Sequence, residues 1–202
     1  MIETILCLSD THNFHHRLGD LPDADVVIHC GDFTSNGTEA EALDFLEWFC
    51  DLPHRHKIFI LGNHDVCMYG AKVDGLDANC HILNNSGITI DGLKFYGVPF
   101  FMEGFEDGYV HSIPGDTDVL ITHQPPQGIL DEAAMEDITH FGSAVLLERV
   151  SAVKPAYSIF GHVHADYGTV EKDGTVYVNC SALREDGELN APVLLRPGRR
   201  QL

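Results

Sequence analysis

The chain has 202 residues, which is the size of one domain, and we expect a single domain over residues 1–202. Its 31 acidic residues against 12 lysines and arginines give a formal net charge of -19, which argues against non-specific binding to nucleic acids or acidic membranes. Six cysteines without a Cys-x-x-Cys pair, the lack of a basic leader and the lack of a membrane-length apolar run together predict a cytoplasmic protein.

The first part of the chain predicts three strands and a helix. Residues 2–8 and 26–30 are continuous apolar runs, which are typical of strands buried on both faces. Thr38 and Glu41 then have the spacing of a capping box, and apolar residues follow them at helical intervals. The third apolar run covers residues 57–61. We therefore expect strand, strand, helix and strand in that order.

The middle of the chain changes its pattern. Residues 69–79 show no clear period and predict a surface excursion. Asp91-Gly92 then separates two short apolar segments, as a tight antiparallel hairpin requires, and Asp173-Gly174 has the same setting later in the chain. Residues 100–115 predict an irregular aromatic loop, which is long enough to suggest a functional role.

A crossover connects the last two apolar runs of the α/β pattern. Residues 119–122 and 157–160 each predict a strand, and between them Ser143 can cap a helix that ends before Pro155. A strand, a helix and a second strand in this order predict parallel neighbours in one sheet. The whole pattern therefore predicts an α/β fold.

Five of the predicted strands end in residues that can bind a metal ion. The carboxyl ends of parallel strands face one crevice of an α/β sheet, so side chains that are distant in sequence can meet there. His162 and His164 are two positions apart, and in an extended segment their imidazoles point to the same side. The strand-end residues are Asp10 and His12, Asp32, Asn63 and His64, His123, and His162 and His164.

This set of motifs resembles the calcineurin-like metallophosphoesterase superfamily, and neighbouring residues look like its small MPPED-type branch. The resemblance implies a four-layer α/β/β/α sandwich with a dinuclear metal site at the carboxyl ends of the strands. It covers almost the whole chain. The matching stretches are Asp10-Thr11-His12, Gly31-Asp32, Gly62-Asn63-His64-Asp65, His123 and Gly161-His162-Val163-His164.

The resemblance also implies a ligand set and a role for each residue. His64 would protonate or stabilise the leaving oxygen, and Asp65 would hold its ring in the useful tautomer. Oxygen and nitrogen donors without a thiolate suit two divalent ions, with manganese preferred and iron or zinc also compatible. By similarity Asp10, His12 and His164 bind the first ion, Asn63, His123 and His162 bind the second, and Asp32 bridges them.

The expected reaction is hydrolysis of a phosphate ester by a hydroxide that bridges the two ions. Two divalent ions, two carboxylates and one hydroxide leave a local charge of about +1, and the motifs contain no lysine or arginine. This favours a small phosphodiester, such as a cyclic nucleotide or another nucleotide diester. The alternatives are a phosphomonoesterase or protein phosphatase, and a non-catalytic interaction module, which usually lacks a ligand.

Several other residues stay without a functional assignment. His29 lies inside an apolar run and is expected to be a hydrogen-bonded core histidine. Phe100, Phe101 and Tyr109 offer rings for stacking on a base, although packing against the core is the more common role. The spacing of His15, His16 and His140 does not point to a role.

Overall fold

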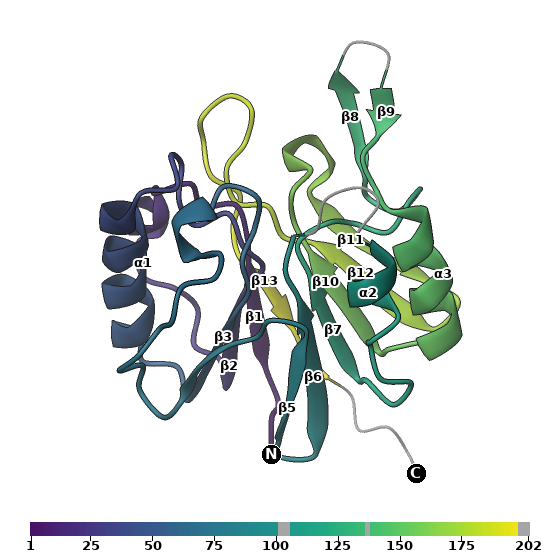
Figure 1. The fold of residues 1–202 in the computed structure, drawn as a ribbon, viewed down its shortest axis with the longest axis horizontal. Helices are drawn as coiled ribbons and strands as arrows, with labels where there is room; N and C mark the ends of the chain where they lie inside the picture. Colours follow the sequence, from purple (N-terminus) through teal and green to yellow (C-terminus); the bar gives the residue numbers. More distant parts are fainter. Residues whose placement is uncertain (101–105, 136–137, 198–202) are drawn as a thin grey trace.

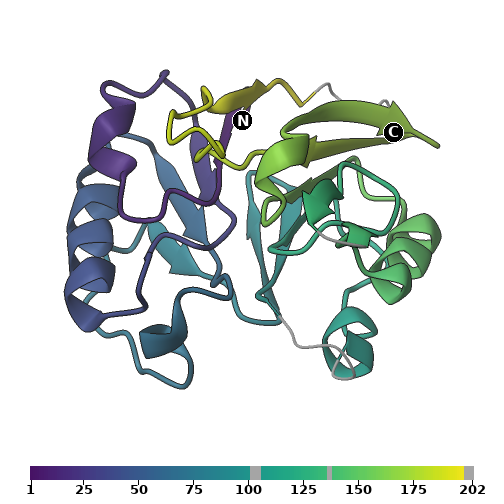
Figure 2. The same ribbon diagram turned by 90° about the horizontal axis from the view of Figure 1, so that it is seen from above.

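The computed structural model describes residues 1–100, 106–135 and 138–197. Two large sheets lie face to face, with helices on the outer side of each, so the chain forms helix, sheet, sheet and helix layers (Figures 1 and 2). The predicted four-layer α/β/β/α architecture is therefore confirmed. Within the described residues, no helix has the length and apolar character needed to span a membrane.

The first sheet has the strand order β13-β1-β2-β3-β4. The strands β1 to β4 run parallel to one another, and β13 pairs with β1 in the antiparallel direction. Their bounds are Ile5–Leu8 for β1, Val26–His29 for β2, His56–Phe59 for β3, Cys80–Ile82 for β4 and Val193–Leu195 for β13.

The second sheet has the strand order β11-β12-β10-β7-β6-β5. Its inner strands β6, β7, β10 and β12 are parallel, which confirms the predicted crossover, and β5 and β11 close the edges as hairpin partners. Their bounds are Ser86–Ile90, Leu93–Val98, Val119–Thr122, Tyr157–Phe160, Gly168–Lys172 and Thr175–Asn179 for β5, β6, β7, β10, β11 and β12. A separate ribbon pairs β8 (Glu132–Met135) with β9 (Ile138–His140).

Each long helix begins at the cap that its sequence predicts. The helix α1 (Glu39–Asp51) has a complete capping box between Thr38 and Glu41, and α3 (Ala144–Val153) begins after Ser143, whose hydroxyl accepts the N–H of Leu146 at 3.2 Å. The short α2 (Glu106–Val110) lies within the stretch that was expected to be irregular. The described residues also form the 3₁₀ turns η1 (His15–Leu18), η2 (Val66–Met68) and η3 (His164–Asp166).

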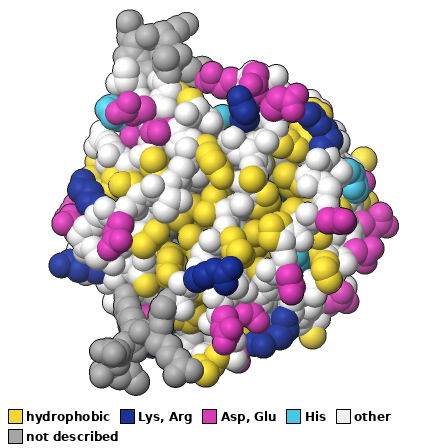
Figure 3. All heavy atoms as spheres, turned by 180° about the vertical axis from the view of Figure 1, so that it is seen from behind, with side chains coloured by type: hydrophobic (Ala, Val, Ile, Leu, Met, Phe, Trp, Pro, Cys, Tyr) yellow, Lys and Arg dark blue, Asp and Glu magenta, His cyan; other side chains and the backbone are white. Residues whose placement is uncertain are grey.

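The core explains why β1 is apolar at every position. Along β1, Ile5 and Cys7 face the other sheet, whereas Leu6 and Leu8 face the layer of α1, so both sides of the strand are buried. A third cluster packs α2 and α3 against the second sheet. Seen from behind, apolar side chains occupy the middle of the surface and charged ones surround them (Figure 3). All six cysteines are free thiols.

Candidate metal centre

The strand ends that carry the predicted ligands meet at one edge of the double sheet. The strands β1, β2 and β3 are parallel neighbours in the first sheet, and β7 and β10 are parallel neighbours in the second. The carboxyl ends of these strands point to the upper edge in Figure 1, where the ribbon β8–β9 also projects. The convergence that the sequence predicts is therefore present in the fold.

The backbone turns sharply at four of these positions. Asp10, His12, Asp32 and His162 have φ values of 51°, 41°, 55° and 70°, in the left-handed region that non-glycine residues seldom adopt. The expectation of an extended segment through His162 is therefore wrong, because β10 ends at Phe160 and the chain turns before η3. Both imidazoles still reach the edge, but by this turn rather than by strand alternation.

The first group of donors consists of Asp10, His12 and His164, whose ligand atoms lie within 4.8 Å of one another. His164 Nε2 lies 3.5 Å from Asp10 Oδ1 and 3.2 Å from His12 Nε2. The Asp10 carboxylate is fully buried, and it accepts the backbone N–H of His162 at 2.9 Å. Burial raises the pKa of Asp10, but the hydrogen bond from His164 and the charge of His123 outweigh it and hold this pKa well below its usual range.

The second group consists of Asp32, His123 and His162, with Asn63 beside them. Asn63 Oδ1 lies 2.9 Å from His123 Nε2 and 3.0 Å from His162 Nδ1. His123 donates its Nδ1–H to the carbonyl of Cys30 at 2.8 Å, and this bond turns Nε2 toward the group. Such a backbone acceptor is the usual partner of a metal-binding histidine, because it selects the tautomer with a lone pair on the other nitrogen.

Asp32 lies between the two groups. Its Oδ2 is 3.8 Å from His12 Nε2 on one side and 3.4 Å from His123 Nε2 on the other. Its Oδ1 accepts the backbone N–H of His64 at 2.7 Å, which holds the carboxylate in this orientation. Burial lowers the pKa of His123, but the charge of Asp32 more than compensates and raises this pKa to about 9.

The ring of His64 has a different partner from the one that the sequence predicts. His64 donates its Nδ1–H to the carbonyl of Ser35 at 2.9 Å, and its exposed ring stands edge-on to His12 at 4.7 Å between centroids. The carboxylate of Asp65 instead accepts backbone N–H groups of Gly62 and Asp32, both at 2.8 Å. The prediction that Asp65 orients the His64 ring is therefore wrong, because its acceptor positions are occupied by the loops.

The surroundings of the Asp65 carboxylate disfavour its charged form. Burial is the largest effect and the nearby charge of Asp32 the second, and together they raise the pKa of Asp65 to about 7. Thr34 partly offsets this effect, since its N–H and hydroxyl donate to Asp65 Oδ1 at 3.0 and 2.9 Å.

Two residues at the end of β12 also support the site, and the sequence analysis did not identify them. The hydroxyl of Ser181 donates to Asp10 Oδ2 at 3.0 Å, and the amide of Asn179 donates to the carbonyl of Val163 at 2.8 Å. The strand β12 is the parallel neighbour of β10, so its carboxyl end reaches the same edge. The signal was present in Asn179-Cys180-Ser181, which follows an apolar run as the other motifs do.

An aromatic ring covers one side of the second group. The ring of Phe100 lies 6.0 Å from that of His123 and 5.8 Å from that of His162. Tyr109 is partly buried and packs against the core beneath the second sheet, while Phe101 lies outside the described residues. Phe100 thus limits the space around the imidazoles.

The other histidines lie apart from the two groups. His29 is buried and hydrogen-bonded to Thr11 Oγ1 at 3.0 Å, which confirms it as a core histidine. His140 lies on β9, 2.9 Å from Asp131. His15 and His16 lie on η1 beside α1.

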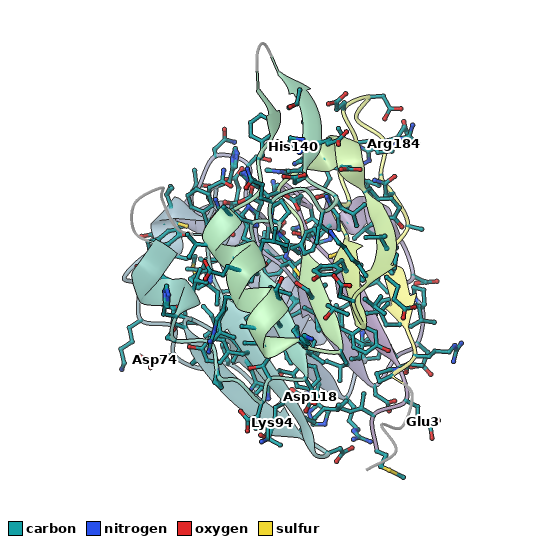
Figure 4. All side chains as sticks on the ribbon, turned by 90° about the vertical axis from the view of Figure 1, so that its right-hand side faces the viewer. Glu3, Asp74, Lys94, Asp118, His140 and Arg184 are labelled. Carbon is teal, nitrogen blue, oxygen red and sulfur yellow. The ribbon has the colours of Figure 1, made fainter. Side chains whose placement is uncertain are left out.

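Two hollows open next to His164. The first, of about 290 Å³, is lined by Ala133, Phe141, His162, Val163, His164, Ala165 and Glu185. The second, of about 400 Å³, includes Arg184, whose guanidinium lies 2.7 Å from Asp186 Oδ2. Figure 4 shows Arg184 and His140 at the same end of the molecule, opposite Lys94 and Glu3.

A model of the calcineurin-like phosphoesterase family matches residues 3–166. The chain belongs to this family. A UPF0046 protein of Caenorhabditis elegans is 35% identical over 211 residues, which cover 92% of this chain and 71% of that protein. Human metallophosphoesterase domain-containing protein 1 is 32% identical over 228 residues, which cover 94% of this chain and 69% of that protein, and this similarity confirms the predicted MPPED-type branch.

Solved structures share the fold of this phosphoesterase family member at low identity. TT1561 of Thermus thermophilus has a TM-score of 0.67 and 11% identity, with 89% of each chain covered. GAP50, described as the anchor in the inner membrane complex of Plasmodium, has a TM-score of 0.56 and 13% identity over 89% of this chain and 71% of its own. Both likenesses concern the fold.

Proposed function

We propose that this phosphoesterase hydrolyses a small phosphodiester with two divalent metal ions bound at the edge of the double sheet. The observation that carries the proposal is the position of Asp32 Oδ2, which faces His12 of one donor group at 3.8 Å and His123 of the other at 3.4 Å. A carboxylate shared by two groups of nitrogen donors is what a pair of ions roughly 3.5 to 4 Å apart requires.

The donor atoms fit such ions by their chemistry as well as by their positions. They are carboxylate and amide oxygens and imidazole nitrogens, which suit manganese, iron or zinc, and we propose manganese. Asp10, His12 and His164 would hold one ion, and Asn63, His123 and His162 the other, with Asp32 common to both. When bound, the ions supply Lewis acidity and a nucleophile derived from water at neutral pH.

His64 is the residue of this chain that we propose for proton transfer. Its Nδ1–H is held by the carbonyl of Ser35, so Nε2 is left for the leaving oxygen of the substrate. A carbonyl acceptor at Nδ1 suits the neutral ring and the protonated ring alike. The exposed ring can therefore exchange its proton with solvent between turnovers.

The charges around the hollows support a diester rather than a monoester. The hollow beside His162 and His164 is lined by Glu185 and otherwise by uncharged or imidazole side chains of the described residues. In the neighbouring hollow, Arg184 is already paired with Asp186. A dianionic monoester would find few cationic side chains here. The single negative charge of a diester is balanced by the local charge of about +1 that the two ions and their ligands would leave.

A pair of chromogenic esters tests the substrate class. We expect the manganese-loaded protein to hydrolyse bis(p-nitrophenyl) phosphate with a higher kcat/KM than p-nitrophenyl phosphate, and a panel of cyclic and dinucleotide diesters would then identify the class of nucleotide. A preference for the monoester would overturn the diester assignment in favour of a phosphomonoesterase or protein phosphatase.

A substitution of Asp32 tests whether the activity belongs to this centre. We expect Asp32→Asn to abolish turnover and to lower bound manganese, because one bridging charge serves both ions. The matched control is Asp173→Asn in the turn between β11 and β12, where φ is 53° and asparagine is tolerated. Normal turnover in Asp32→Asn would exclude the mechanism.

A non-catalytic interaction module is the competing class of function. The observation against it is that two donor groups lie side by side, Asp10 with His12 and His164, and Asp32 with His123 and His162. Metal-loaded protein without turnover on any ester of the panel would favour this class.

A further inference from the structure

A second cluster of histidines lies outside the candidate metal centre, where η1 packs against α1. The ring of His15 is completely buried there, with the rings of Trp48 and Phe45 at centroid distances of 4.9 and 5.8 Å. His16, the next residue, is more than half exposed. Asp44 of α1 faces both histidines, so the cluster joins two elements that are distant in sequence.

The buried ring of His15 lacks hydrogen bonds to other described residues at both of its nitrogens. Its Nε2 lies 3.1 Å from Asp44 Oδ2, but outside hydrogen-bond geometry. Leaving a buried polar atom without a partner is costly, and native structures rarely do so without a ligand, water or ion to compensate. Nε2 of His15 therefore needs an additional binding partner, such as a ligand, water or ion, near Asp44.

We propose that His15, His16 and Asp44 form a separate site for one divalent transition-metal ion of the zinc type. Asp44 Oδ2 lies 3.1 Å from His15 Nε2 and 3.2 Å from His16 Nε2, and the ligand atoms of all three residues lie within 4.8 Å of one another. Tetrahedral zinc with bonds of about 2.0 to 2.1 Å places its ligand atoms roughly 3.4 Å apart. The two distances from Asp44 Oδ2 thus match two edges of such a tetrahedron.

The chemistry of the donors selects the class of ion. Two imidazoles and one carboxylate are the ligands of many three-residue zinc sites, whereas calcium and magnesium prefer oxygen. Burial lowers the pKa of His15 to about 4, so its ring is neutral at physiological pH and carries the lone pair that a metal needs.

The surroundings of the cluster attract a cation and leave room for water. A hollow of about 890 Å³ opens beside it, and His16 and Asp44 belong to its wall. Three further carboxylates line this hollow, from Asp20, Glu47 and Asp51. Their field raises the local concentration of cations, and water from the hollow can occupy the fourth position of a tetrahedral ion.

A simple ion pair between His16 and Asp44 is the competing interpretation. It accounts for the contacts of His16 Nε2 with both carboxylate oxygens, at 3.1 and 3.2 Å. It does not account for Nε2 of His15, which stays without a hydrogen bond in that arrangement. A metal ion would bind Nε2 of His15 and Nε2 of His16 with one bond each, and it would fasten η1 to α1.

Zinc stoichiometry tests the proposal. After equilibrium dialysis at micromolar free zinc, elemental analysis should give one zinc fewer per chain for His16→Ala and for Asp44→Asn than for the unchanged protein. Both side chains are partly exposed, so these variants should fold. His81→Ala, on β4, is the matched control and should bind as much zinc as the unchanged protein. Equal zinc in the unchanged protein and in His16→Ala would overturn the proposal.

The Asp32→Asn variant separates this site from the candidate centre. It should keep the zinc that depends on His16, so that adding His16→Ala to Asp32→Asn removes one further equivalent. The manganese-dependent activity of His16→Ala should equal that of the unchanged protein. If His16→Ala loses zinc only when Asp32 is intact, the ion belongs to the candidate centre and the proposal fails.

Discussion

The carboxylate of Asp65 accepts the backbone N–H of Asp32 at 2.8 Å, which joins the loop after β2 to the loop after β3. The same oxygen accepts the N–H of Gly62, also at 2.8 Å, and the other oxygen accepts the N–H and hydroxyl of Thr34. One side chain thus holds four donors from two loops. Asp65 is therefore a residue that positions Asp32, the carboxylate proposed to bridge the ions.

We expect Asp65→Asn to lower both stability and metal binding. An amide offers one oxygen and turns its NH₂ toward backbone N–H groups, so some of the four buried donors lose their acceptor. We expect this loss to lower the unfolding free energy by about 2 to 4 kcal/mol. Urea denaturation and manganese titration would measure the two effects. A stable, metal-replete variant with a low kcat would instead mean that Asp65 affects the chemical step and not the position of Asp32.

His64→Ala should retain its metal while turnover slows by roughly 10²-fold or more, the usual scale for lost proton transfer. The ring is exposed and water can replace its hydrogen bond to the carbonyl of Ser35, so stability should change little. Metal analysis would measure the retained metal and steady-state kinetics the slower turnover, with His81→Ala as a control. Because His64 also lies near His12 and Asp32, loss of metal would show that it is a ligand.

Ser181→Ala should weaken binding of the ion held by Asp10 by roughly 10-fold. Residues that hydrogen-bond to a metal ligand typically contribute 10- to 100-fold to metal affinity. The variant loses the contact of the hydroxyl with Asp10 Oδ2 at 3.0 Å and a second contact with Asn179 Oδ1 at 2.9 Å. Isothermal titration with manganese would measure the change. Ser158→Ala is a matched control on β10, because the buried hydroxyl of Ser158 has no hydrogen-bond partner among the described residues. Equal weakening in both variants would point to general loosening of the fold.

Acid should destabilise the protein through His29. Burial lowers the pKa of His29 from 6.5 to about 3, so the unfolded chain binds a proton at this position in a pH range where the folded chain does not. This stability is present above the unfolded pKa and is lost as the pH falls. From about pH 6 to about pH 4.5, the unfolding free energy of the unchanged protein should fall by about 2 kcal/mol more than that of His29→Gln.

Urea denaturation at several pH values would measure this difference in slope. The starting stability of the variant is irrelevant to the comparison, because only the change with pH is compared. Parallel slopes for the two proteins would mean that His29 takes up its proton in the folded state.

Much of the candidate centre could be predicted because its residues follow strand ends, which the apolar runs mark. The parallel direction of β1, β2 and β3 then brings Asp10, Asp32 and Asn63 to one edge of the sheet, independently of the conformation of the loops. The helices could be predicted for a similar reason, since the caps at Thr38 and Ser143 are local signals.

The remaining features depend on contacts between distant segments. The partner of Asp65 follows from the packing of two loops, and the turn at His162 follows from its N–H bond to Asp10, 152 positions earlier. The strands β4 and β13 have only three residues each, which is too short for a periodic pattern. They pair because neighbouring strands offer free backbone N–H and C=O groups, and the availability of these groups cannot be predicted from a local sequence pattern.

The left-handed backbone at Asp10, His12, Asp32 and His162 means that the donor groups can form only in a chain whose fold holds these angles. L-amino acids hold such angles only when surrounding structure imposes them, and at His162 the hydrogen bond that does so crosses between the sheets to Asp10. A fragment with the second sheet alone would carry the motif Gly161-His162-Val163-His164 in full and yet lack the bond that holds His162 at this angle. Metal capture by this protein is therefore a property of the finished double sheet, and splitting the chain between its halves should abolish it.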